Sequence, residues 1–286
     1  MRLLGAAMAA YGSLAFGAPV RDVRRLAIIT PNSSTPRIIE YASSSPDLHL
    51  RLISPHPYKN PRRETNTWGG RELRRLLKHE LSKGLNRQVV ISGASGYSAQ
   101  ITEDDVRKHG IIVAHQRDGS RLKPEDGGPQ LVYPLADSSL SDQLRSDAWW
   151  VWYVSGIFVG SPDPRLRVVR NGRTENRDLG KLKGVVHESL TPCYPAGQRM
   201  IVPPKSAVEA SLLSLDSLAA GRPKVRKIIV HNHLGSSMEI DGDFEKYALS
   251  FSWNGETIRP SFGGPIQLVR RGAQPSCFFF VDRIEL

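Results

Sequence analysis

The sequence lacks the composition of a disordered protein. Charged residues make up 23% and hydrophobic residues 40% of its 286 positions, so it has neither the charge excess nor the scarcity of apolar side chains that keeps a chain unfolded. Its 20 prolines and 25 glycines are typical of a protein rich in turns and short strands. We therefore expect a folded protein, and its length permits two ordinary domains.

An apolar run long enough to cross a membrane is also missing. The charge-free segment of residues 3–17 is shorter than the roughly 20 residues that a bilayer-spanning helix needs, and no later segment approaches its length. Because Met1 and Arg2 precede it and Arg21 follows soon after, the segment has the layout of a secretory signal peptide, an N-terminal membrane anchor being the alternative. We predict a signal peptide over residues 1–18 and an exported, periplasmic protein of a bacterium that is not an integral membrane protein.

Acidic residues are relatively few: 28 Asp and Glu stand against 39 Lys and Arg, which gives a net charge of +11. The basic residues are spread along the chain, and the small cluster of Arg71, Arg74 and Arg75 lies among leucines at helical spacing, which places the arginines on the outer face of a helix. This pattern indicates a solvated helix face. Together with export it argues against nucleic acid as a partner, and it leaves anionic ligands or an anionic membrane surface open.

Two stretches of the sequence repeat one pattern. Residues 89–101 and residues 228–240 each read as a β-branched strand, a short turn and a second short strand, and they align without a gap so that Gly96 matches Gly235. Further along each half, an Asp-Gly or Asn-Gly pair is followed eight residues later by Gly-Gly-Pro. Such pairs favour hairpins because both residues tolerate positive φ. The matched order predicts an internal duplication.

Each half also places one short helix before its hairpins, over residues 70–81 in the first and about 214–220 in the second. Strands, then a helix, then hairpin-linked strands predict an α+β fold with a mainly mixed or antiparallel sheet and few short helices. The polar stretch 171–177 is typical of a boundary. We predict a first module over residues 19–172 and a second, diverged module over residues 173–286.

Four segments of the first half, taken in order, resemble the oxidoreductase molybdopterin-binding domain of the sulfite oxidase family. They are Ser95–Ala99, Ala114–Gly119, Gly127–Pro134 and the tryptophan-rich strand from Trp149. The resemblance covers about residues 67–160 well and the second copy more weakly. It implies two tandem sulfite-oxidase-type modules and a pterin or molybdopterin as the cofactor.

Catalytic members of that family carry a cysteine in the turn after the strand equivalent to Val89–Ile91, and its thiolate ligates molybdenum. In this chain the corresponding turns are Ser92–Ser95 and His231–Leu234, and neither contains cysteine. The resemblance is therefore strongest to small exported members that lack the thiolate and hold a pterin without turnover. We expect no molybdenum.

These observations favour an exported protein that binds a small heterocyclic ligand of the pterin or molybdopterin type. We expect it to be non-catalytic and to present its occupancy to a membrane-bound signalling partner. One alternative is a molybdopterin-dependent oxidoreductase with an atypical set of metal ligands. Another is a structural or assembly protein in which both pockets have decayed.

A pterin is a flat heterocycle, so its site needs polar turn groups, a face to stack on and close approach of the backbone. Arginines gain an added role if the ligand carries a phosphate. The predicted ligand-binding residues of the first module are Ser92, Ser95, Tyr97, His115, Arg117, Arg121, Gly127, Gly128 and Tyr133. Each also has a structural interpretation: the tyrosines as core residues, His115 as a strand residue, the glycines as turn residues and the arginines as solvated charges.

Two pairs of residues in the second half leave further questions open. His231 and His233 alternate at a strand end and could offer two metal ligands, but a third is not apparent, which favours a structural role. Cys193 and Cys277 are the only cysteines. Because oxidising compartments favour pairing, a Cys193–Cys277 disulfide is our hypothesis, and two free thiols are the alternative.

Overall fold

The computed structural model describes residues 25–31, 36–41, 45–54, 63–81, 85–94, 97–146, 150–161, 163–194, 206–219, 225–272 and 276–286. The predicted signal peptide and Ser95 lie outside these residues. Among the residues described, no helix is both long and apolar enough to span a bilayer.

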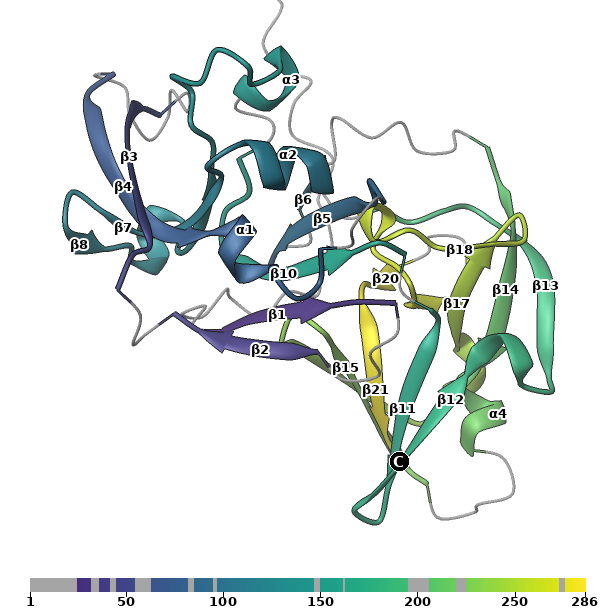
Figure 1. The fold of residues 1–286 in the computed structure, drawn as a ribbon. Helices are drawn as coiled ribbons and strands as arrows, with labels where there is room; N and C mark the ends of the chain where they lie inside the picture. Colours follow the sequence, from purple (N-terminus) through teal and green to yellow (C-terminus); the bar gives the residue numbers. More distant parts are fainter. Residues whose placement is uncertain are drawn as a thin grey trace, which may run out of the picture.

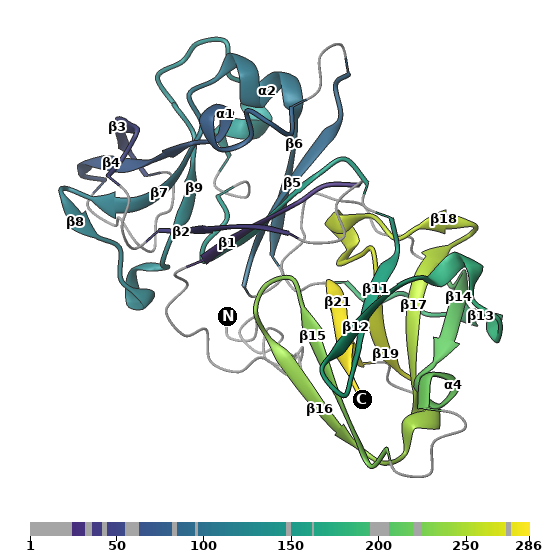
Figure 2. The same ribbon diagram turned by 60° about the horizontal axis from the view of Figure 1, so that its bottom comes forward.

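Short strands dominate both halves of the chain (Figures 1 and 2). The first half contains β1 (Arg25–Ile29), β2 (Arg37–Glu40), β3 (Leu48–Ile53), β4 (Thr65–Glu72), β5 (Gln88–Gly93), β6 (Ser98–Thr102), β7 (Ile112–Arg117), β8 (Ser120–Arg121), β9 (Gln130–Val132) and β10 (Val154–Val159). The second contains β11 (Arg165–Arg170), β12 (Arg173–Asp178), β13 (Val185–Leu190), β14 (Val208–Ser214), β15 (Lys227–Asn232), β16 (Ser237–Asp241), β17 (Tyr247–Trp253), β18 (Glu256–Thr257), β19 (Gln267–Arg270), β20 (Ser276–Phe278) and β21 (Val281–Glu285). The α-helices are α1 (Leu73–Leu76), α2 (Glu103–Lys108), α3 (Asp142–Arg145) and α4 (Leu215–Ala219). The predicted fold class, mainly sheet with few short helices, is confirmed.

The strands form four sheets, two in each half. Sheet A has the order β2-β1-β10-β5-β6 and sheet C the order β12-β11-β21-β15-β16. In each, the second and third strands run parallel and the other neighbours antiparallel. Sheet B runs β3-β4-β7-β8 with β9 on β7, and sheet D runs β13-β14-β17-β19-β20 with β18 on β17. Sheets A and C thus share one strand order, including the parallel pair, and sheets B and D share theirs except for β20, which has no counterpart strand among the described residues of sheet B. Figures 1 and 2 show the two halves side by side.

The chain passes from sheet A to sheet C between Val159 and Arg165. Asn171 and Gly172, where we predicted the boundary, instead form the tight turn between β11 and β12, both with positive φ. The polar stretch that resembles a linker is therefore the turn and the exposed strand of a hairpin. The change of sheet comes before residue 173 because β11 pairs with β21 at the end of the chain.

Both predicted hairpins are present. Asp118 and Gly119 join β7 to β8 with φ of 51° and 77°, and Asn254 and Gly255 join β17 to β18 with φ of 50° and 81°. Two successive positive φ values give a turn whose twist matches that of the flanking strands, which explains the choice of residues.

The helix predicted over residues 70–81 is shorter than expected. Only Leu73–Leu76 is helical, because the preceding residues continue β4 along β7. There Gly70 lies so close to the partner strand that a Cβ atom would come within 2.3 Å of the Val113 carbonyl oxygen. The predicted orientation holds for the helical residues, since Leu73 and Leu76 are buried and Arg74 and Arg75 are exposed. It is wrong for Arg71, which lies in β4, half-buried and paired with Asp47.

Each half has its own hydrophobic core. In the first, leucines of α1 pack with one face of sheet A and with sheet B, and Trp68 and Trp150 meet edge to face at 5.8 Å between ring centroids. In the second, α4 packs with sheets C and D, and the Ser214 hydroxyl before it accepts a hydrogen bond from the Asp216 backbone. Helix α2 begins with a capping box between Thr102 and Asp105, which satisfies its first free N–H groups.

The second face of sheet A packs on the other half of the protein. Ala27, Ile29, Val90 and Phe158 of this face form a small core with Phe280, and Leu234 and Phe279 pack against it; this contact is called the seam. The Phe158 and Phe280 rings stack at 5.1 Å. The seam fixes the two halves against each other by burial of apolar surface.

A disulfide bond joins Cys193, just after β13, to Cys277 in β20, with a Cα–Cα distance of 6.2 Å. The hypothesis of pairing is thus confirmed. The bond staples the segment that follows one edge strand of sheet D to the strand at its other edge.

Candidate functional site

The turn after β5 is the place where the resemblance locates the ligand. Val89, Val90 and Ile91 form a fully buried strand in sheet A, as their β-branched side chains favour. Beyond it the backbone turns: the Gly93 N–H donates to the Tyr97 carbonyl at 2.8 Å, and the Ala94 N–H donates to the Tyr153 carbonyl at 2.9 Å. The turn is therefore held both to β6 and to the segment before β10.

Ser92 is the predicted site residue with the clearest unmet need for a partner. Its side chain is fully buried, and within the described part of the chain its Oγ atom has no hydrogen-bond partner. Ser92 shares a face of β5 with Val90, so it points toward the seam. Its neighbour across the ladder is Gly156, where a Cβ atom would lie 2.7 Å from the Leu234 side chain of the other half. A buried hydroxyl without a partner is costly unless a ligand or water hydrogen-bonds to it.

At Gly127 and Gly128, side chains of the protein itself, rather than a ligand, come close to the backbone. The two glycines have φ angles of 97° and 59°, in the region that favours glycine. A Cβ atom at Gly127 would lie 3.2 Å from the Trp152 ring, and one at Gly128 would lie 3.0 Å from the Tyr153 ring. The Tyr153 hydroxyl donates to the Pro124 carbonyl at 2.8 Å and locks the arrangement. On this side the two aromatic rings occupy the space that a ligand would need.

Tyr133 and His115 lie in the interior of the first half. Tyr133 is fully buried, and burial raises the pKa of its phenol well above the usual value, with Asp105 and Tyr97 adding to the rise. The His115 ring is buried beside Tyr41 at 6.2 Å between centroids. Tyr133 thus lies in the core and His115 lies buried in strand β7.

The two predicted arginines differ in their surroundings. Arg117 forms an ion pair with Asp126 at 3.1 Å and lies over the Trp68 ring at 5.8 Å from its centroid. Such a guanidinium is held in place by charge and by the aromatic face. Arg121 lies exposed on the β7–β8 hairpin. The structure thus brings Ser92, Tyr97 and the glycine pair around one turn system and leaves Arg121 outside it.

Residues that sequence reasoning missed complete this turn. Tyr153 has a φ of 54°, unusual for a tyrosine, and its backbone links the turn after β5 to Gly127. Trp152 pairs with Gln130 in an isolated bridge. The only signal in the sequence was their place in an aromatic run, which does not reveal what they contact.

A thiolate-ligated metal does not fit this turn. Its sequence offers hydroxyls and backbone groups, and the two cysteines of the protein are bonded to each other elsewhere. A side chain at Gly93 would meet the Trp152 carbonyl oxygen at 2.2 Å. The residues do fit the organic part of such a cofactor, because the unpartnered hydroxyl of Ser92 can form a hydrogen bond with the polar edge of a heterocycle.

The equivalent turn of the second half has different chemistry. The His231 Nε2 atom lies 3.2 Å from a carboxylate oxygen of Glu285, and His233 is buried against the edge of Phe158 near Asp282. Burial lowers the pKa of His233. Within the described ranges, no three His, Cys, Asp or Glu side chains are placed to hold a metal ion.

One of three comparisons with known proteins matches a family model to the part of the chain that contains this turn. The sulfane dehydrogenase SoxCD from Paracoccus pantotrophus matches 92% of this chain over 80% of its own, at 13% identity and a TM-score of 0.36, a likeness too loose to carry an argument. No curated protein matches the chain. Residues 45–135 match the family model described as oxidoreductase molybdopterin binding domain, a stretch that includes the turn after β5 and the glycine pair. Residues 45–135 are therefore similar to a molybdopterin-binding domain, and the match covers less than half of the chain.

Proposed function

We propose that the protein is an exported, non-catalytic binder of a pterin- or molybdopterin-type ligand. The family of residues 45–135 supports the ligand class. Export is supported by the Cys193–Cys277 bond, because disulfides persist in oxidising compartments such as the bacterial periplasm.

One observation carries the non-catalytic part: the protein has two cysteines, and their sulfurs are bonded to each other in the second half. A thiolate ligand for molybdenum would have to come from the turn after β5, which holds none. The remaining donors near that turn, hydroxyls and backbone amides, suit hydrogen bonds to a heterocycle rather than ligation of a soft metal centre.

The seat of the ligand in this proposal is Ser92 at the seam. A heterocycle that hydrogen-bonds to this hydroxyl would contact the face of sheet A on which Leu234 of the other half packs. Ligand binding would then favour one packing of the halves over another, and a membrane-bound signalling partner could read the change. The shared strand order of the halves supports a tandem of two modules, of which the first holds the ligand.

The test is to release and identify what co-purifies with the full-length protein from its native host. We expect a pterin by mass spectrometry and fluorescence after denaturation, together with substoichiometric molybdenum by elemental analysis. Ser92→Ala should lower the pterin occupancy several-fold. Ser250→Ala is the matched control, because Ser250 is equally buried and its hydroxyl also lacks a partner in the described part of the chain, but it lies in sheet D.

Two results would overturn the proposal. Stoichiometric molybdenum would indicate an oxidoreductase with an atypical ligand set. Release of no pterin from protein of the native host would favour a structural or assembly role.

A further inference from the structure

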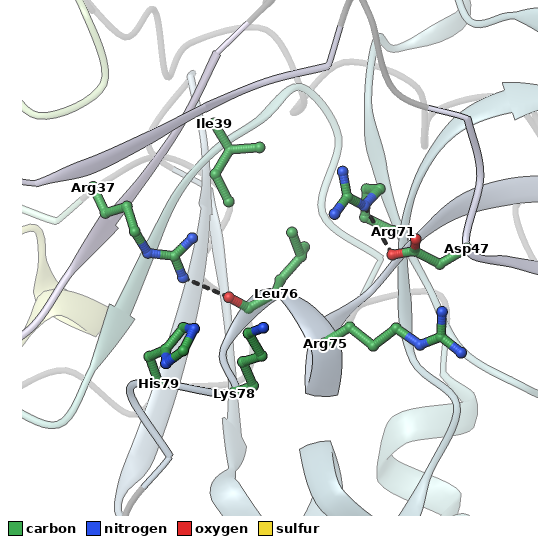
Figure 3. A pocket seen from close by; sticks show the side chains of 8 residues that line it. All are labelled: Arg37, Ile39, Asp47, Arg71, Arg75, Leu76, Lys78 and His79. Carbon is green, nitrogen blue, oxygen red and sulfur yellow. Dashed lines mark hydrogen bonds and ion pairs between the residues drawn. The ribbon is translucent and has the colours of Figure 1, made fainter.

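A pocket of 380 Å³ lies in the first half, away from the turn after β5. It opens between the edge strand β2, the segment just before β3, the end of β4 and helix α1 (Figure 3). In sheet A, β2 and β5 are separated by β1 and β10, three strand spacings or about 14 Å. The pocket is therefore distinct from the ligand seat at Ser92.

The charge of the lining is strongly positive. Arg37, Arg71, Arg75 and Lys78 contribute four cations, and Asp47 is the one carboxylate in the lining, so four minus one leaves +3 with His79 neutral. Arg71, Arg75 and Lys78 are close in sequence, from the end of β4 to the turn after α1, and the fold adds Arg37 of β2 to them. Each of the three arginines pairs with one carboxylate, and Lys78 adds a further positive charge. An anion bound in the recess would be attracted by this excess of positive charge.

Arg37 and Arg71 are each held through one edge of the guanidinium group and keep other N–H donors for a ligand. Arg37 donates to the Leu76 carbonyl at 2.5 Å and pairs with Glu80 at 2.8 Å, and Arg71 pairs with Asp47 at 2.8 Å through Nε. Figure 3 shows the Arg37 and Arg71 side chains entering from opposite sides. A guanidinium has five N–H donors, so one or two of these contacts orient the group without exhausting it.

Arg75 and Lys78 are the more available cations. The Nε atom of Arg75 lies 3.2 Å from Glu72, and its side chain is 63% exposed. Lys78 is exposed and makes no ion pair within the part of the chain that the structure describes. Both can turn toward a bound anion at little cost, since they exchange water for a charge-assisted hydrogen bond.

Ile39 and Leu76 add an apolar patch between the cations. A pocket with an apolar patch and several converging donors suits a small ligand with an anionic group and a short apolar body, and 380 Å³ lies at the lower end of the range for small-molecule sites. Arginine forks match the geometry of phosphoryl oxygens. We propose that this pocket binds the phosphoryl group of a small soluble phosphate monoester.

The shape of the site favours a free compound over a membrane surface. The cations line a recess bounded by a strand edge and a helix, whereas binding to an anionic bilayer needs basic side chains on a surface that can lie against the headgroups. The proposal does not depend on pterin binding, because none of its residues contributes to the turn after β5.

The test titrates the full-length protein with phenyl phosphate, monitored by ³¹P NMR and calorimetry, and in parallel with inorganic phosphate. We expect saturable binding that weakens with salt and that is weakened roughly tenfold or more in Arg75→Gln/Lys78→Gln, from the loss of charge-assisted hydrogen bonds. The matched control is Arg74→Gln. Arg74 is a neighbour on α1, is similarly exposed and also pairs with Glu72, but it does not line the pocket, so its loss should change the affinity less than about twofold.

Three results would overturn the proposal: no saturable binding by the unmodified protein, an equal loss in Arg74→Gln, or binding only to phosphatidylglycerol vesicles in a sedimentation assay. If the double variant does not fold, Lys78→Gln alone decides, because this exposed side chain has no ion pair to lose in the described structure. Its affinity for phenyl phosphate should still fall several-fold.

Discussion

Removing the Cys193–Cys277 bond should destabilise the second half of the protein substantially. The bond closes a loop with a sequence separation of 84 residues. In the chain-entropy account, a cross-link over about 84 residues restricts the unfolded state by about 4.5 kcal/mol at 25 °C. For a protein of this size, such a loss corresponds to a fall in Tm of roughly 10 °C.

The bond also positions an aromatic cluster. Tyr194, next to Cys193, packs edge to face on Trp253 and Phe262, with both centroid distances at 5.9 Å. Burial raises the pKa of Tyr194 to about 12. If the bond is lost, the segment before Tyr194 is no longer tied to β20, so the environment of Trp253 should change. Near-ultraviolet circular dichroism therefore reports on the same event as Tm.

The assay compares thermal unfolding of the unmodified protein and of Cys193→Ala/Cys277→Ala, each with and without a reductant. The reductant should lower Tm of the unmodified protein toward that of the variant, and it should leave the variant unchanged. A reductant effect below about 2 °C on a protein shown to be fully reduced would refute the entropic reasoning.

Two further perturbations test the seam and the turn. Because burial depresses the pKa of His233 below 6.5 in the folded protein, the unfolded state binds more protons there, and stability should fall as the pH drops below about 6.5. His233 faces Asp282, Arg167 and Phe158. In His233→Gln, the free energy of unfolding should therefore fall less steeply below pH 6.5 than it does in the unmodified protein. Equal slopes in the two proteins would contradict this. Gly93→Ala should cost about 2 kcal/mol, because its Cβ atom would lie 2.2 Å from the Trp152 carbonyl oxygen. Gly180→Ala, where the nearest atom is 3.5 Å away, is its control in denaturant unfolding, and equal losses would speak against a steric cause.

Local signals in the sequence located most of the elements. The Asp118-Gly119 and Asn254-Gly255 pairs predicted their hairpins because positive φ is a property of the residues themselves. The β-branched run Val89–Ile91 predicted β5 for the same local reason. The extent of the helix at Leu73 was missed because pairing of the preceding residues with β7, distant in sequence, decides where the strand ends.

The candidate site was harder to predict because it depends on contacts between distant segments. Gly127 and Gly128 have the freedom that the sequence suggested, but Trp152 and Tyr153 occupy the adjoining space. Tyr133 has the donor of a ligand-binding residue and lies in the core instead. Neither outcome can be predicted from the local sequence pattern, since both depend on which distant residues pack against these positions.

Sheets A and C cannot exchange places at the seam, because the side chains at their equivalent positions differ. The row Ala27–Gly156–Ser92 of sheet A corresponds by register to Arg167–Arg283–His231 of sheet C. The next row, Ile29–Phe158–Val90, corresponds to Val169–Glu285–Ile229.

The first sheet therefore has a second apolar face, whereas the second sheet has charged side chains at three of the six matched positions and a histidine at a fourth. Charges buried against an apolar partner would cost several kcal/mol each, so only the face of sheet A can be covered by the other half. It follows that the buried hydroxyl of Ser92 has no equivalent hydroxyl in the second half, because the imidazole of His231 stands in its place, with Nε2 3.2 Å from a Glu285 oxygen. Pterin binding with a stoichiometry of two per chain would contradict this reasoning, and one per chain is the expected value.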